Sequence, residues 1–350
     1  MYQFSKIFTC IGLLAMASLA FSQQPAIEEN AKASAIAMIN APQPDFAALP
    51  STLTVEQLAD LGLSQPNKAE SLSINAKDGI PLHINLYSHW GKNSVLLLHG
   101  AASSSYTYNI MAGKIRDALH ANVYAMDFRG HGQSGGIKGD VNYKNQYADD
   151  VEDVLRYIQK SKPNNKIIIA GHSMGGGIAL IHASLAEHIN IDGYVLFAPN
   201  LGVSAPTMKK PALPAESDNE PFLKLHIPRI VAVYQLNQMG DSVYDHLPVM
   251  FFNMPAQLGT NQYSYRAMIS TSSENYQQSL GLIDSPLLTL VGLSDEAFDA
   301  NAFPEAMKYA QQAEVQIVAG QTHNGIRHSD TAMKHLTKWA KTHALLDESI

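Results

Sequence analysis

A Gly-His-Ser-Met-Gly stretch at residues 171–175 could present a serine for nucleophilic chemistry. It directly follows a predicted buried strand over residues 166–170, which contains three consecutive isoleucines, and it opens a predicted helix over 175–186. A serine on such a sharp turn is exposed at the edge of a sheet, and flanking glycines let the strand and helix approach closely. The helix N-terminus also favours developing negative charge. We therefore predict Ser173 as a nucleophile; the alternative is a glycine-rich turn without chemistry.

A second loop could stabilise the negative charge that such an attack creates. His99, Gly100 and Ala101 follow a predicted buried strand over residues 94–98. Acyl transfer needs two backbone N–H groups aimed at the developing oxyanion. We expect one from Met174, directly after the nucleophile, and the other from Ala101. His99 is interpreted as a structural hydrogen-bonding residue of this loop rather than as a base.

The serine also needs a histidine base, which a carboxylate must orient. The chain contains 14 histidines, so their order along the sequence has to select among them. After a serine at a strand-to-helix turn, the acid is expected just past a later strand and the histidine just past the last strand. Asp295 and His323 occupy these positions. Asp299 remains an alternative acid and His328 an alternative base.

The elements that must position these residues alternate between strand and helix. Apolar runs and turn residues predict strands over residues 71–75, 81–88, 94–98, 121–126, 166–170, 193–198, 286–291 and 314–318. Helices are expected over 108–119, 146–160, 175–186 and 330–342, and in 146–160 the apolar residues recur at helical spacing. This alternation predicts an α/β fold with a mainly parallel eight-stranded sheet and helices on both faces.

The alternation stops over residues 200–284, which we interpret as a cap inserted after the sixth strand. The core that carries these residues would then comprise residues 69–199 and 285–350. Residues 23–68 form an N-terminal arm, in which a capping pattern predicts a short helix over 54–61 and little chemistry.

The cap is rich in methionine and aromatic residues, and residues 224–236 within it look helical. Such side chains suit an acyl-chain pocket or lid, or they could form the cap's own small core. We expect part of the group to face the site: Tyr234, Met239, Tyr244, Met250, Phe251, Phe252, Met254, Tyr263, Tyr265 and Met268. Arg229 and Arg266 could hold an anion, but solvation at the surface is the preferred interpretation.

A polar loop over residues 127–135 follows the fourth strand and lies beside the expected site. Arg129 or His131 could bind substrate from this loop. The preferred interpretation is that Asp127, Arg129 and Ser134 hydrogen-bond one another and fix the loop.

Composition and charge exclude several other classes of function. The formal net charge is −7 and no run of Lys or Arg builds a basic face, which argues against a nucleic-acid partner and against capture by anionic lipid. No metal-binding or dinucleotide-binding motif is present, so we expect neither a metal nor another cofactor.

Residues 1–22 have the features of a secretory signal peptide. Lys6 precedes an apolar stretch over residues 7–20, and small residues follow at suitable cleavage positions. The stretch is short for a membrane span, although an uncleaved anchor is the alternative. We therefore expect a secreted or periplasmic protein with no stable membrane span after cleavage. Cleavage would also remove Cys10, which is the only cysteine. The mature chain could then form neither a disulfide nor a thiolate metal site.

Together these motifs resemble the monoacylglycerol lipase and lysophospholipase group of α/β hydrolases, over about residues 70–345 apart from the cap. The resemblance implies the α/β-hydrolase fold and a serine esterase that acts on small acyl esters or lipids, with Ala101 and Met174 as oxyanion donors. Two features differ from that group. The loop after Ala101 reads Ala-Ser-Ser-Ser over residues 102–105 instead of Gly-Glu-His, and a cap of about eighty residues is long.

Two other functions remain open. The same three residues could serve an aminopeptidase or amidase. The chain could also be a non-catalytic binding protein on a hydrolase scaffold.

Overall fold

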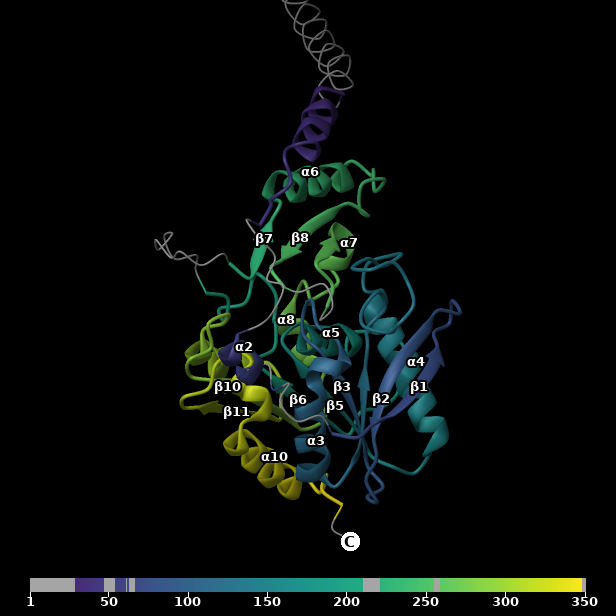
Figure 1. Ribbon diagram of the computed structural model, residues 1–350, viewed down its shortest axis with the longest axis vertical. Helices are drawn as coiled ribbons and strands as arrows, with labels where there is room; N and C mark the ends of the chain where they lie inside the picture. The colour runs from purple at the N-terminus through teal and green to yellow at the C-terminus, as the bar shows by residue number, and fades with distance from the viewer. Residues whose placement is uncertain are drawn as a thin grey trace, which may run out of the picture.

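The computed structural model describes residues 29–46, 54–60, 62, 67–209, 221–254 and 259–347. Its centre is a sheet of eight strands in the order β1-β2-β4-β3-β5-β6-β10-β11 (Figure 1). The strands are β1 (Glu70–Asn75), β2 (Pro81–Tyr87), β3 (Ser94–Leu98), β4 (Asn122–Met126), β5 (Ile167–His172), β6 (Gly193–Phe197), β10 (Leu287–Gly292) and β11 (Ala313–Val318). Only β2 runs in the direction opposite to the other strands. The predicted mainly parallel eight-stranded sheet is therefore confirmed.

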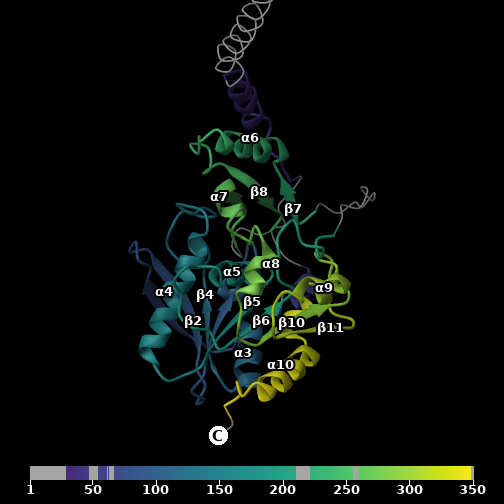
Figure 2. The ribbon, with the colours of Figure 1, turned by 180° about the vertical axis from the view of Figure 1, so that it is seen from behind.

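Helices cover both faces of this sheet (Figures 1 and 2). One face carries α3 (Asn109–Leu119) and α10 (Asp330–Thr342), which pack against each other. The other face carries α4 (Gln146–Ser161), α5 (Met174–His182) and α8 (Tyr276–Gly281). The apolar residues of the central strands are buried on both sides, as expected for a parallel sheet between two helix layers. Helix α5 is shorter than the predicted 175–186.

The strand register brings the ends of the parallel strands to one edge. Leu98 of β3 pairs with Gly171 of β5 and with Met126 of β4, and Gly292 of β10 pairs with Val318 of β11. The loops that follow these five strands therefore leave the sheet side by side. Ligands of open α/β sheets bind at this carboxyl edge.

A second, smaller unit interrupts the chain between β6 and β10. It contains β7 (Leu223–Leu225), α6 (Ile227–Gln238), β8 (Pro248–Phe252), β9 (Gln262–Ser264) and α7 (Tyr265–Met268). The three strands form an antiparallel sheet in the order β7-β8-β9, which lies above the carboxyl edge of the main sheet (Figure 1). We refer to this unit as the cap.

The predicted helix over residues 224–236 starts too early. Residues 223–225 pair with β8, and α6 begins only at Ile227. His226 caps this helix by accepting a hydrogen bond from the Arg229 N–H, and Pro228 stands in its first turn, where its missing N–H costs nothing. Pro228 therefore suits the start of the helix better than its interior.

The arm reaches the cap as well as the core. Residues 29–39 are helical, which the sequence did not lead us to expect, and Ala35 and Ile39 are buried against α6. Lys32 adds a 2.7 Å ion pair to Asp241. Farther along the arm, α2 (Val55–Asp60) lies against the core. Among the described residues, no helix is both long and apolar enough to cross a bilayer.

Candidate active site

Ser173 stands on a strained turn between β5 and α5. Its φ of 53° and ψ of −117° lie in a region that side-chain-bearing residues rarely adopt. A Cβ on Gly171 would lie 2.6 Å from the Gly175 carbonyl oxygen, and one on Gly175 would lie 2.3 Å from the Leu98 oxygen. The two glycines of the motif are thus required because backbone approaches backbone at both positions.

The structure places the carboxylate of Asp295 against the imidazole of His323. Asp295 Oδ2 lies 2.9 Å from His323 Nδ1, and its Oδ1 accepts the N–H groups of Ala297 and Phe298 at 2.8 Å each. The carboxylate is buried. Because an ionised carboxylate only accepts hydrogen bonds, Nδ1 of His323 carries the proton and Nε2 is left as the basic nitrogen.

Neither alternative residue joins this pair. Asp299 accepts the N–H of Asn301 at 3.0 Å and thereby caps a short 3₁₀ turn. The Nε2 of His328 faces the carbonyl oxygen of Asp60 at 2.9 Å. The geometry therefore selects Asp295 and His323 from the candidates that the sequence offered.

Backbone contacts tie the loops of the acid and the histidine together. A Cβ on Gly292 would lie 2.2 Å from the Gln321 oxygen, so only glycine permits this approach. The same oxygen accepts the Ser294 N–H at 3.0 Å. Glu296 then accepts the N–H of His323 at 3.0 Å through its exposed carboxylate.

The histidine loop is also tied to the serine turn. His172, directly before Ser173, donates from Nε2 to the carbonyl oxygen of His323 at 2.9 Å, and the two rings lie 4.7 Å apart. The ring of Phe298 contacts His323 edge-on at 5.3 Å. Ser173 and His323 are both partly exposed, and no side-chain hydrogen bond reaches the Ser173 hydroxyl in the described part of the chain.

Three consecutive amides over residues 100–102 form what we call the oxyanion loop. The outer two N–H groups are bonded, that of Gly100 to Tyr108 Oη at 2.8 Å and that of Ala102 to Tyr263 Oη at 2.6 Å. The middle N–H, of Ala101, has no acceptor among the described residues, and the same is true of the Met174 N–H. The two amides that the sequence proposed as oxyanion donors are therefore free to receive a ligand.

His99 fixes the peptide that carries the Ala101 N–H. Its Nδ1 donates to the Gly100 carbonyl oxygen at 2.8 Å, and its Nε2 accepts the Phe128 N–H at 3.2 Å. Both ring nitrogens are thus used in the neutral form, as the structural interpretation of His99 expected. Tyr108, which accepts the Gly100 N–H, donates to His172 Nδ1 at 2.6 Å.

Burial keeps three of these histidines neutral. It lowers the pKa of His99, lowers the pKa of His131 to about 3, and holds the pKa of His172 well below its usual range. All three are almost completely enclosed. Their hydrogen bonds are therefore those of neutral rings, each with one donor and one acceptor nitrogen.

The 127–135 loop is fixed partly as the sequence suggested, because Asp127 and Ser134 bond to each other while Arg129 has other partners. Asp127 accepts the N–H groups of Ser105 and Gln133, and Ser134 Oγ donates to the Asp127 carbonyl oxygen at 2.6 Å. Arg129 does not join them. Its buried guanidinium pairs instead with Asp78 at 2.7 Å and Asp150 at 2.6 Å, residues that lie far from it in sequence. Neither Arg129 nor His131 is exposed to a substrate.

The two cap arginines have structural partners. Arg266 pairs with Asp140 at 2.6 Å, and Arg229 donates to the carbonyl oxygens of Ile39 and Pro248. The expectation that both are solvated at the surface was therefore wrong. Of the aromatic group, Phe252 and Tyr263 join the main core and Tyr265 packs with the arm helix, whereas Tyr234 and Met239 are exposed.

The arm also contacts the histidine loop, although the sequence suggested little chemistry for it. Asp60 of α2 accepts the hydroxyl hydrogen of Thr322, the residue before His323, at 2.7 Å. Thr322 Oγ1 in turn accepts the Gly325 N–H at 2.8 Å. The capping pattern located α2, but no sequence signal indicated where the helix docks.

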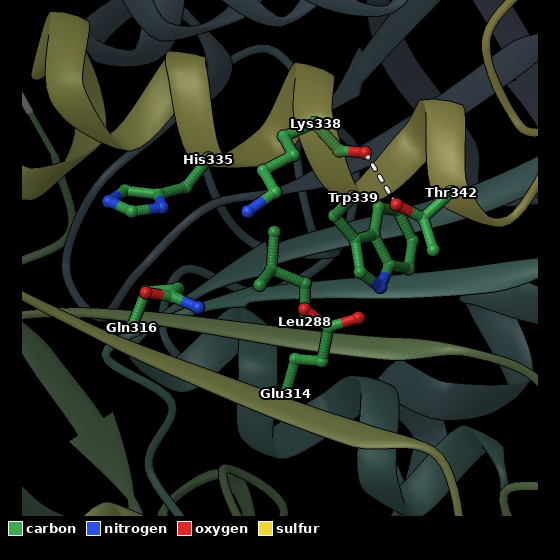
Figure 3. Close-up of a pocket in the computed structure, with 7 residues that line it drawn as sticks. All are labelled: Leu288, Glu314, Gln316, His335, Lys338, Trp339 and Thr342. Carbon is green, nitrogen blue, oxygen red and sulfur yellow. Dashed lines mark hydrogen bonds between the residues drawn. The ribbon is translucent and has the colours of Figure 1, made fainter.

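Two cavities lie away from these residues. A small one of about 90 Å³ is enclosed by residues of β10, β11 and α10, near the amino ends of the strands (Figure 3). A wider groove of about 760 Å³ runs between α3 and α10. Neither is lined by Ser173 or His323. Within the described residues, no three His, Cys, Asp or Glu side chains gather so as to hold a metal ion.

The strain at Ser173 predicts an unusual effect of glycine. Ser173→Gly should be more stable than Ser173→Ala by about 1 kcal/mol of unfolding free energy, because glycine tolerates a positive φ. It should therefore also unfold at a higher temperature. Thermal melts of both variants check this. Equal stability, or a more stable Ser173→Ala, would show that the turn is not strained.

The buried neutral histidines predict acid lability. In the unfolded chain their pKa returns to about 6.5, so unfolding takes up protons below that pH. The stability that the neutral rings contribute is fully present above pH 6.5. His131, whose pKa is lowered to about 3, and His172, whose pKa lies well below its usual range, should each cost about 1.4 kcal/mol per pH unit as the pH drops from 6.5 to 5. Urea unfolding at several pH values measures the slope. In His131→Leu the unfolding free energy should change less steeply with pH, by about 1.4 kcal/mol per pH unit. An unchanged slope would contradict a neutral His131 in the folded protein.

Comparison with known proteins identifies the family of this chain. Residues 91–330 match the family described as serine aminopeptidase, S33. The chain is 26% identical to a monoacylglycerol lipase of Mycolicibacterium smegmatis over 212 residues, covering 57% of this chain and 69% of that protein. It is 27% identical to human monoglyceride lipase over 239 residues, covering 66% and 75%.

Solved structures show the same fold. Est1E from Butyrivibrio proteoclasticus, solved with ferulic acid bound, superimposes with a TM-score of 0.53 at 18% identity, covering 78% of this chain and 98% of that one. Since the family match spans more than half of the sequence and includes Ser173, Asp295 and His323, this chain belongs to the serine aminopeptidase S33 family of α/β hydrolases.

Proposed function

We propose that this chain is a carboxylic ester hydrolase that cleaves acyl esters through an acyl-enzyme on Ser173. The observation that carries the proposal is the buried Asp295 carboxylate on His323 Nδ1, in loops that converge on the strained Ser173 turn. Two backbone amides that find no acceptor among the described residues, those of Ala101 and Met174, complete the set of groups that acyl transfer needs.

The first half of the reaction forms the acyl-enzyme. His323 Nε2 takes the proton of Ser173 Oγ as that oxygen bonds to the ester carbon. The ester carbonyl becomes an oxyanion, which accepts the N–H groups of Ala101 and Met174 at the positive end of α5. Asp295 holds the imidazole in the required tautomer and stabilises the imidazolium. The tetrahedral intermediate collapses, and the alcohol leaves with the proton from His323.

The second half repeats these steps with water. His323 Nε2 removes a proton from a water molecule, whose oxygen bonds to the acyl carbon. The second oxyanion uses the same two amides. The intermediate then releases the carboxylic acid, and the proton returns from His323 to Ser173 Oγ. The ester and one water molecule together supply all the atoms of the alcohol and the carboxylic acid, and the chain returns to its starting state.

Small acyl esters or lipids are the substrate class that we propose. The monoacylglycerol and monoglyceride lipases among the relatives carry this substrate in their names. Amide cleavage by the same residues is the second candidate. The family description names aminopeptidases, and the exposed Glu296 carboxylate beside His323 could hold a substrate ammonium group.

A ladder of p-nitrophenyl esters from acetate to palmitate tests the proposal. We expect Ser173-dependent hydrolysis with a chain-length optimum, and we expect Ser173→Ala to lose activity by at least about 10³-fold because the nucleophile is gone. Leu-p-nitroanilide serves as the amide control in the same assays.

Each outcome of these assays has a distinct meaning. Faster cleavage of the anilide than of any ester would indicate that the protein is an aminopeptidase or amidase. Ester cleavage that survives in Ser173→Ala would place the chemistry elsewhere. A folded wild-type protein that cleaves neither substrate would leave the binding-protein alternative.

We also propose that the protein is exported, as its first 22 residues suggest. Cleavage after Ala20 or Ser22 would remove Cys10 and leave the helix at residues 29–39 near the new N-terminus. N-terminal sequencing of protein recovered from the periplasm or medium should find this start. Full-length chain found only in the membrane fraction would instead indicate the uncleaved anchor.

A further inference from the structure

The oxyanion loop is held by two tyrosines from different parts of the fold. Tyr108 belongs to the core, whereas Tyr263 belongs to β9 of the cap and lies 161 residues from the amide that it binds. Tyr263 is completely buried. The cap thus contributes a polar contact next to the amide that we propose as an oxyanion donor.

The tautomer of His131 decides how the hydroxyl of Tyr263 is bonded. His131 Nδ1 lies 2.9 Å from the Arg129 carbonyl oxygen, so this nitrogen carries the proton of the neutral ring. His131 Nε2, 2.7 Å from Tyr263 Oη, must then accept. Tyr263 donates its only proton to His131 and accepts the Ala102 N–H at 2.6 Å with a lone pair. The Oη also lies 3.7 Å from the Met174 Sδ, a long contact to a weak acceptor, so the proton is assigned to the 2.7 Å bond with His131.

Ala102 needs such support because its backbone is strained. Its φ is 59°, a value that favours glycine, and its side chain is fully buried. Its carbonyl oxygen accepts the N–H of Thr260, another cap residue, at 3.1 Å. Both polar groups of Ala102 are therefore bonded to the cap, and strained conformations persist only where the surroundings fix them.

We propose that Tyr263 is a positioning residue, which holds Ala102 so that the neighbouring Ala101 N–H points at the oxyanion. This inference rests on the proposed esterase function. His99 fixes the peptide before Ala101, and Tyr263 fixes the peptide after it. The hydroxyl acts through Ala102 and does not touch the reacting atoms. The cap accordingly helps to build the oxyanion hole as well as covering the site.

Tyr263→Phe tests the inference, because it removes the hydroxyl and keeps the ring. With p-nitrophenyl butyrate we expect kcat to fall about 10-fold to 100-fold, since misplacing an oxyanion donor weakens transition-state binding. KM should stay within about 3-fold, because the ground-state ester gains little from this donor. The Ki of butylboronic acid, whose tetrahedral adduct with Ser173 occupies the oxyanion position, should rise by a factor similar to the fall in kcat.

Tyr265→Phe is the matched control. Tyr265 is buried two residues away in the same cap, and no hydrogen bond reaches its hydroxyl within the described residues. Its substitution should leave kcat, KM and the boronate Ki unchanged. Thermal melts of both variants show whether the assays are run on folded protein.

A second variant covers the case in which Tyr263→Phe folds poorly. Tyr263→Phe leaves the buried His131 Nε2 unpaired, which is costly; adding His131→Leu removes that nitrogen. The double variant should fold better and keep the low kcat. Recovery of wild-type kcat in the double variant would contradict the inference.

The outcomes separate the two proposals. An active wild type with an equally active, folded Tyr263→Phe overturns the role of Tyr263 and leaves the esterase function intact. A rise in KM alone, or equal losses in Tyr263→Phe and Tyr265→Phe, overturns it as well. A wild type without Ser173-dependent ester cleavage overturns both proposals, because no oxyanion then forms.

Discussion

The whole site depends on the backbone conformation of Ser173. A φ of 53° turns the chain from β5 into α5 so abruptly that the serine stands at the carboxyl edge of the sheet. This conformation is possible because Gly171 and Gly175 let backbone atoms meet at distances that a Cβ would prevent. It also leaves the Met174 N–H, at the start of a helix where the dipole favours negative charge, with no acceptor in the part of the chain that the structure describes. The same backbone turn therefore both strains Ser173 and places the groups that the proposed reaction needs.

The loops around this turn are fixed by buried neutral groups. Tyr108 and Tyr263 each accept one amide of the oxyanion loop and donate to a histidine that burial keeps uncharged. A phenol and a neutral imidazole each offer one donor, so the tautomer of each histidine fixes the direction of its bond to the tyrosine. The same burial makes any unpaired group expensive. The network therefore gives rigidity where the chemistry requires fixed distances, and it makes the fold sensitive to acid.

Much of this site was predictable from sequence because short-range patterns specify it. Isoleucine runs, glycine spacing and chain order led to Ser173, Asp295 and His323, and the structure brings the last two into contact. The partners of Arg129 and the role of Tyr263 were not predictable, since these residues meet across large distances in sequence. The start of α6 was missed because the preceding strand has only three residues, too few for its alternation to be distinguished from helical spacing. The helix at residues 29–39 was not predicted, because this alanine-rich segment shows no clear apolar periodicity.

The most direct test of the central claim is to locate the nucleophile covalently. A fluorophosphonate bonds through phosphorus to an activated serine oxygen and displaces fluoride, so the adduct survives digestion and peptide mass spectrometry. The account predicts one modified residue, Ser173, with labelling strongly slowed in Asp295→Asn because the imidazole loses its orienting carboxylate. An adduct on another residue, or a folded protein that is not labelled at all, would contradict it.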